Sequence, residues 1–132
     1  MNINWSALSK ERRIEILNQA TELTGLPAIA IEKDWWVSLC LNASFSFPYS
    51  KHIVFKGGTS LSKGWNLIER FSEDIDLAID RKFFGFQGDI SKTQIRKLRK
   101  HSCEFISTVF LKDLTQILTD CGAIAECKLF AQ

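Results

Sequence analysis

Apolar positions near the start of the chain recur at helical spacing, at Ile14, Leu17, Ala20 and Leu23. This period predicts an amphipathic helix over residues 9–24, closed by the glycine that follows. A second helix is expected over residues 27–44, because its first residue is a proline, which is favoured at that position. Residues 45–50, which include another proline, are predicted to form a loop.

Two short strands are predicted farther along the chain. Ile53–Lys56 is a brief, mostly apolar run that suits a buried strand. Residues 74–80 alternate, with Ile75, Leu77 and Ile79 on one face and the aspartates on the other. The pattern therefore predicts that Asp74 and Asp76 share a strand face.

Helical patterns also lie between and after these strands. Thr59 or Ser60 can cap a helix that runs to about Arg70. The sequence Ser-Lys-Thr-Gln, which has the form of a capping box, opens a long helix over residues 91–120. A glycine closes that helix, and residues 123–130 are then predicted to add a third strand.

Composition indicates one globular domain over residues 1–132, with 45% hydrophobic and 24% charged residues. The net charge is only +2, so a basic surface must be local. Basic side chains do gather on the predicted long helix, at Lys92, Arg96, Lys97, Arg99, Lys100 and His101. A solvated helix face is the simpler explanation, and an electrostatic footprint for an RNA backbone is the alternative.

The chain is expected to act in the cytoplasm and away from membranes. Its start lacks the basic and apolar regions of a signal peptide, and the segment 35–47 is too short and polar to span a bilayer. The four cysteines show no C-x-x-C spacing and the chain has two histidines, which disfavours a zinc site. Reduced, largely buried thiols are the expected state.

The segment between the two predicted strands carries the candidate chemistry. A glycine turn, Gly57-Gly58-Thr59-Ser60, can bring backbone N–H groups and a hydroxyl to a phosphate, although alone it is equally a tight strand-to-helix turn. It is not a P-loop, because Lys63 is followed by glycine. Two aspartates on one strand face repel unless a cation lies between them, and Mg²⁺ suits carboxylate and phosphate oxygens. Together the features predict a metal–nucleotide site.

These residues resemble a known family. The runs Gly-Gly-Thr-Ser-Leu-Ser-Lys at 57–63 and Arg-Phe-Ser-Glu-Asp-Ile-Asp-Leu at 70–77 are similar to the signature of AbiEii/AbiGii-type nucleotidyltransferase toxins, in the polymerase-β-like nucleotidyltransferase superfamily. The upstream Glu-Lys-Asp-Trp-Trp at 32–36 resembles a segment that precedes that signature. The resemblance implies an α+β fold, with a polymerase-β-like core of a small mixed sheet flanked by helices.

The resemblance also implies an activity. It is the Mg²⁺-dependent transfer of a nucleoside monophosphate from an NTP to an acceptor such as tRNA or another RNA, by the toxin of a toxin–antitoxin or abortive-infection (phage-defence) system with a cognate antitoxin. Asp74 and Asp76 are implied as catalytic, metal-binding residues. The residues implied to bind nucleotide are Gly57, Gly58, Thr59, Ser60, Lys63, Arg70 and Ser72.

Two departures from the family leave an alternative open. The family pattern includes a third carboxylate from a later strand, for which this chain offers only Glu126, in a poorly matching context. Family members also tend to be longer, so the chain would correspond to the N-terminal part of the family architecture. The alternative is a truncated, inactive domain that binds a nucleotide or a partner. In such a domain, apolar surface on the second helix would favour a homodimer.

Overall fold

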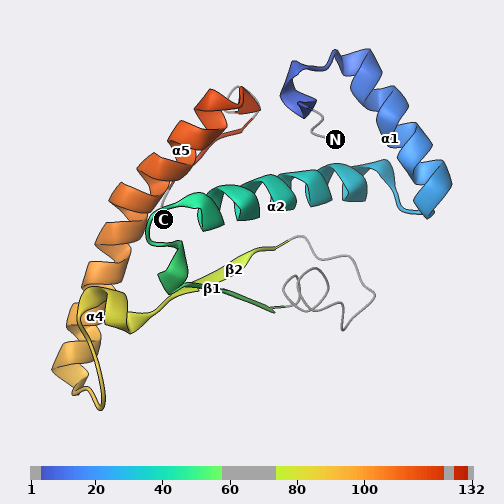
Figure 1. Ribbon diagram of the computed structural model, residues 1–132. Helices are drawn as coiled ribbons and strands as arrows, with labels where there is room; N and C mark the ends of the chain where they lie inside the picture. The colour runs from blue at the N-terminus through green and yellow to red at the C-terminus, as the bar shows by residue number, and fades with distance from the viewer. Residues whose placement is uncertain (1–3, 58–73, 124–126, 131–132) are drawn as a thin grey trace.

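The computed structural model describes residues 4–57, 74–123 and 127–130. Its helices and strands are α1 (Lys10–Thr24), α2 (Ala28–Ser46), β1 (Ile53–Lys56), β2 (Asp76–Ile79), α4 (Lys92–Phe105) and α5 (Leu111–Asp120) (Figure 1). Short 3₁₀ turns occupy Trp5–Ala7, Ser50–His52 and Arg81–Phe84, and a π-helical segment, Ile106–Phe110, joins α4 to α5. None of the helices in the described ranges combines the length and apolar character of a membrane span.

Local sequence signals set the ends of the helices. The Ser9 hydroxyl accepts a hydrogen bond from the Arg12 N–H at 3.2 Å, and Gly25 closes α1 with a left-handed φ of 72°. Before α4, the Ser91 hydroxyl accepts from the Gln94 N–H, and the Gln94 side chain accepts from the Ser91 N–H. These ends confirm the predicted first helix and the predicted capping box.

Strands β1 and β2 form an antiparallel two-stranded sheet in which Ile53 pairs with Ile79 and Lys56 with Asp76. The second strand is therefore shorter than predicted. Asp74 and Ile75 lie beyond the last pair and belong to neither strand. In the described part of the chain the sheet is antiparallel rather than mixed.

The predicted third strand is also not seen where it can be checked. Residues 127–130 are described and form no strand, whereas residues 124–126 lie outside the described ranges. The apolar run near this end of the chain suits a strand, but a strand also needs an edge to pair with. The described residues thus form an α+β arrangement dominated by helices.

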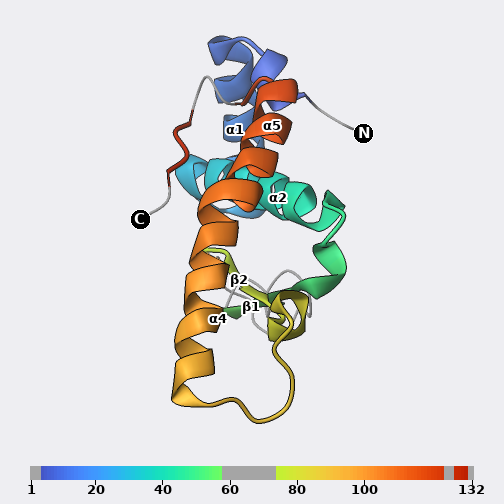
Figure 2. The ribbon, with the colours of Figure 1, turned by 90° about the vertical axis from the view of Figure 1, so that its left-hand side faces the viewer.

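Helix α2 lies between α1 and the sheet, and α4, the π-helical segment and α5 form one rod beside the sheet and the end of α2 (Figures 1 and 2). The core is built around Phe47, Tyr49 and Ile53, which are buried. Around it pack Leu77, Phe83, Phe105, Phe110, Leu114 and Ile117. This core fixes the sheet against the helical rod, and so holds the positions of both strand ends.

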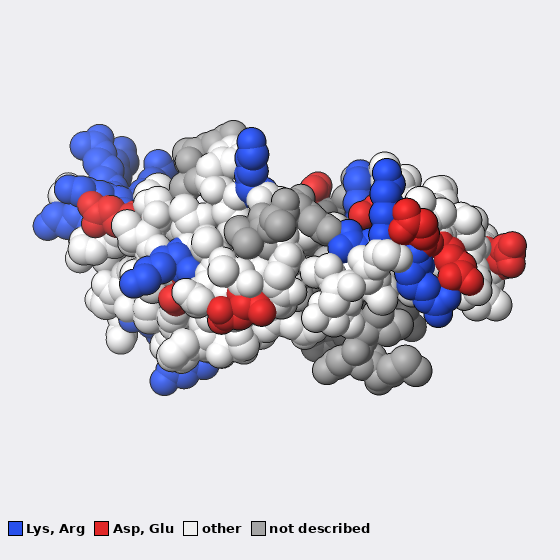
Figure 3. All heavy atoms as spheres, turned by 90° about the horizontal axis from the view of Figure 1, so that it is seen from above, with Lys and Arg blue, Asp and Glu red and all other residues white. Residues whose placement is uncertain are grey.

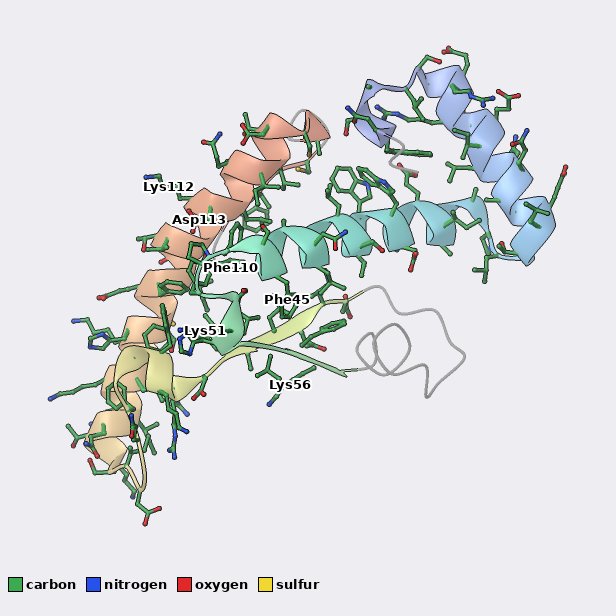
Figure 4. All side chains as sticks on the ribbon, viewed as in Figure 1. Phe45, Lys51, Lys56, Phe110, Lys112 and Asp113 are labelled. Carbon is green, nitrogen blue, oxygen red and sulfur yellow. The ribbon has the colours of Figure 1, made fainter. Side chains whose placement is uncertain are left out.

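Tyr49 connects the core to α5. Its hydroxyl donates a hydrogen bond to the Asp113 carboxylate at 2.9 Å, and its ring meets Phe105 edge-on at 4.9 Å (Figure 4 labels Asp113). Burial, followed by the bond to Asp113, raises the pKa of Tyr49 well above its ordinary value. The phenol therefore stays neutral and serves as a hydrogen-bond donor.

Candidate active site

Gly57, the first residue of the predicted glycine turn, and one of the candidate aspartates meet at the end of the sheet. Lys56 pairs with Asp76, so Gly57 leaves β1 directly beside the first residue of β2. Gly57 has a left-handed φ of 79°, and a Cβ added there would lie 3.1 Å from the Asp76 Cγ and closer still to Oδ2. Because a side chain at position 57 would collide with it, the Asp76 carboxylate lies directly against the backbone of Gly57.

Asp74, the other candidate aspartate, lies near the same end of the sheet but outside its strands. It precedes β2 and lines an open cavity of about 460 Å³ together with Ile75 and residues of α2. Since the strand begins only at Asp76, its alternation does not fix the orientation of Asp74 relative to Asp76. Their shared role stays a prediction.

Two further predicted groups lie outside the described residues. They are the acid proposed as a third carboxylate, Glu126, and the remaining nucleotide-binding positions, Gly58, Thr59, Ser60, Lys63, Arg70 and Ser72. Of the predicted site residues, the structure therefore places Gly57, Asp74 and Asp76.

The donor set suits a hard divalent cation such as Mg²⁺. Asp74 and Asp76 are both exposed carboxylates, the kind of ligand that such a cation prefers. Among the described residues, no three His, Cys, Asp or Glu side chains come together as a candidate metal site. Mg²⁺ needs no third protein ligand, because substrate phosphates and water complete its shell.

Lys56 is a neighbour of the site that sequence reasoning missed. Directly opposite residues of an antiparallel pair have their side chains on one face, so the Lys56 and Asp76 side chains leave the sheet on the same side. Figure 4 shows Lys56 pointing away from α2. From the sequence, its positive charge and its position just before Gly57 could have marked it as a candidate site residue. That it lies opposite Asp76 follows only from the strand register.

Helix α2 presents its two tryptophans to different surroundings. Trp35 faces the N-terminal 3₁₀ turn, where its ring lies 5.9 Å from that of Trp5. Trp36 lines the cavity that Asp74 borders, together with Lys33, Val37 and Cys40. The four cavity residues of α2 follow the i, i+3, i+4, i+7 spacing of one helix face, a signal that could have identified them from the sequence.

Two other residues of α2, Glu32 and Cys40, also line cavities. Glu32 lines a separate cavity beside α1 with Lys10 and Arg13. Burial, followed by the neighbouring Cys127 and Cys121, raises the pKa of the Cys40 thiol. At neutral pH Cys40 is therefore an uncharged part of the cavity wall, and all four cysteines of the chain are free thiols.

The basic residues form a surface at the α4 end of the molecule (Figure 3). The 3₁₀ turn Arg81–Phe84 packs against α4 through Phe83, whose ring lies 5.0 Å from that of Phe105. We define the basic surface as the exposed side chains of Arg81, Lys82, Lys92, Arg96, Lys97, Arg99 and Lys100. Asp89 is the one acidic residue in the same stretch of sequence, so the positive charge of the chain concentrates here.

The chain was compared with known protein families, curated proteins and solved structures. The family described as "Nucleotidyl transferase AbiEii toxin, Type IV TA system" matches residues 41–123. That range includes the glycine turn, both aspartates and the basic surface. Neither the curated proteins nor the solved structures gave a match.

Proposed function

The chain belongs to the family of AbiEii nucleotidyl transferase toxins of type IV toxin–antitoxin systems, and on that premise we propose that it transfers a nucleoside monophosphate from an NTP to an RNA acceptor. The observation that carries the proposal is the contact between the Gly57 turn and the Asp76 carboxylate, with Asp74 two residues away. The family also implies a cognate antitoxin as a partner.

The residues divide the proposed work between them. The backbone amides of the predicted turn Gly57–Ser60 are assigned to the triphosphate from the sequence alone, as are Lys63, Arg70 and Ser72. Asp74 and Asp76 would hold Mg²⁺, which neutralises charge on the phosphates during transfer. Positioning and charge stabilisation supply most of the catalysis in this kind of reaction, so the site needs few other groups.

The proposal predicts that an NTP stabilises the protein only together with Mg²⁺. A ligand present at a hundred times its dissociation constant stabilises the folded state by ~2.7 kcal/mol, which raises the melting temperature by several degrees. ATP in EDTA should have little effect, because the bare triphosphate would face two carboxylates. Thermal unfolding in Mg²⁺–ATP, ATP–EDTA and Mg²⁺ alone measures this, and equal shifts with and without metal would contradict it.

The basic surface is the proposed binding site for the RNA acceptor. Its side chains are exposed and come from two elements that pack together, so they can track a phosphate backbone. Its place on the helical rod, apart from the end of the sheet, suits contact with the body of an RNA rather than with the reacting end (Figure 1).

Reversing two charges on this surface should weaken RNA binding. Arg96→Glu combined with Arg99→Glu should lower affinity for RNA of any sequence and reduce the slope of log K against log salt by about 1.5–2. Lys128→Glu, at an exposed lysine in another part of the chain, is the matched control and should change binding little. Fluorescence anisotropy across a salt series measures both, and an unchanged slope in the double variant would exclude this surface.

A further inference from the structure

We infer that the cavity between the N-terminal 3₁₀ turn, α2 and the end of α5 binds a small, neutral aromatic carboxamide. The cavity is about 360 Å³, within the usual range for small-molecule sites. Its lining includes Asn4, Trp5, Ser6, Trp35, Asn42 and Cys121. Figures 1 and 2 place the N-terminal turn and the end of α5 on the side of α2 opposite the sheet. The cavity is therefore separate from the end of the sheet, and the inference does not depend on nucleotide transfer.

Two residues of the cavity lining carry buried polar atoms without a hydrogen-bond partner. These atoms are Nε1 of Trp5 and Oγ of Ser6, and the Trp5 residue is only 5% exposed. Buried polar atoms are nearly always paired, because an unpaired one has lost its bonds to water without replacement. Of the residues that the structure describes, Thr21 is the one other with such an atom. A molecule bound in the cavity would supply partners for the two that belong to its lining.

The two atoms determine which groups a bound molecule must offer. The indole N–H of Trp5 can only donate a hydrogen bond, and the Ser6 hydroxyl can also donate. A carbonyl oxygen, which has two lone pairs, is a suitable acceptor for such donors. The side-chain amides of Asn4 and Asn42 add both donors and acceptors to the lining. A carboxamide matches this set, because it combines an acceptor oxygen with an N–H donor.

The remaining lining favours an uncharged aromatic ring. None of the described residues that line the cavity carries a charge, so a charged ligand would lose its hydration without gaining a counter-ion. The ring of Trp35 packs on that of Trp5, with centroids 5.9 Å apart and an interplanar angle of 37°. This contact holds an aromatic surface in the cavity wall, and aromatic surfaces favour aromatic ligands. Nicotinamide has the size, the neutral ring and the carboxamide that these features require.

The first test compares nicotinamide with nicotinate, which has the same ring but a carboxylate in place of the amide. The chain has four tryptophans, and Trp5→Phe identifies the indole N–H signal of Trp5 in the NMR spectrum. Nicotinamide should shift that signal in a saturable manner. Nicotinate should bind at least ~10-fold more weakly, because its charge has no partner in the cavity.

The second test removes one of the unpaired atoms. Ser6→Ala should weaken nicotinamide binding about 2- to 13-fold, because one hydrogen bond to the ligand is lost. Without ligand, the variant should melt at the same temperature as the wild type or higher, because alanine removes an unpaired hydroxyl. Ser107→Ala, at an exposed serine of the π-helical segment, is the matched control and should leave nicotinamide binding unchanged.

Each unfavourable outcome overturns a stated part of the inference. If nicotinamide gave no saturable shift of the Trp5 signal, the cavity would not be a site for this class of ligand. Equal affinity for nicotinate would remove the requirement for a neutral amide. A lower melting temperature of Ser6→Ala with unchanged nicotinamide affinity would show that the hydroxyl has only a structural role. If Trp5→Phe did not fold, calorimetric titration of wild type and Ser6→Ala would decide the same question.

Discussion

Replacing Asp76 by asparagine should abolish nucleotide transfer and leave the chain folded. Asparagine has nearly the same shape but lacks the charge that would hold a metal ion beside the Gly57 turn. The loss of a single charge-stabilising group in an active site typically lowers turnover on the order of 10²–10³-fold. Transfer of labelled nucleotide, together with thermal unfolding, measures both effects.

The apo protein should unfold at the same temperature or slightly higher, since one of two nearby carboxylates is removed. Asp74→Asn should show the same loss of activity. Asp89→Asn, at an exposed aspartate in the loop before α4, is the matched control and should remain active. Wild-type activity in Asp76→Asn would show that Asp76 does not bind the metal ion. An unfolded variant would show that the carboxylate is structural.

Gly57→Ala is expected to have the second largest effect. The left-handed φ of 79° costs a non-glycine residue roughly 1–2 kcal/mol, and the new Cβ would collide with the Asp76 carboxylate. The turn or the carboxylate must then move, so Mg²⁺–NTP binding should be lost as well as stability.

Gly85→Ala provides the comparison that isolates the collision. Gly85 has a similar φ of 84°, but a Cβ there would meet nothing within 4 Å. It should show only the backbone cost, with normal NTP binding. Urea unfolding and NTP titration of the two variants measure the difference, and normal binding by Gly57→Ala would mean that the turn does not need to lie against Asp76.

Elements with local signals were predictable from the sequence. The caps at Ser9 and Ser91 and the stop at Gly25 involve residues within a few positions of each other. The strand Ile53–Lys56 was predicted with its observed bounds, because a compact apolar run between turn residues has few alternatives. The family was likewise identifiable, because its signature is a contiguous stretch of residues.

Features that depend on distant partners were not predictable. The start of β2 at Asp76 depends on where β1 ends, and no periodicity in residues 74–80 contains that information. Trp36 and Asp74 line one cavity although they are far apart in sequence. The opposition of Lys56 and Asp76 likewise depends on strand register. In each case tertiary packing decides the arrangement, and a single sequence shows only the residue types.

The most direct test of the account is to compare NTPs labelled at different phosphates. The wild-type protein is incubated with RNA, Mg²⁺ and an NTP carrying the label on either the α- or the γ-phosphate, for each of the four bases. Transfer of a nucleoside monophosphate moves the α label to RNA and releases the γ label with pyrophosphate. The account predicts α-labelled RNA with at least one NTP. Transfer of the γ label, or binding of Mg²⁺–NTP with no label transferred from any of the four, would contradict it.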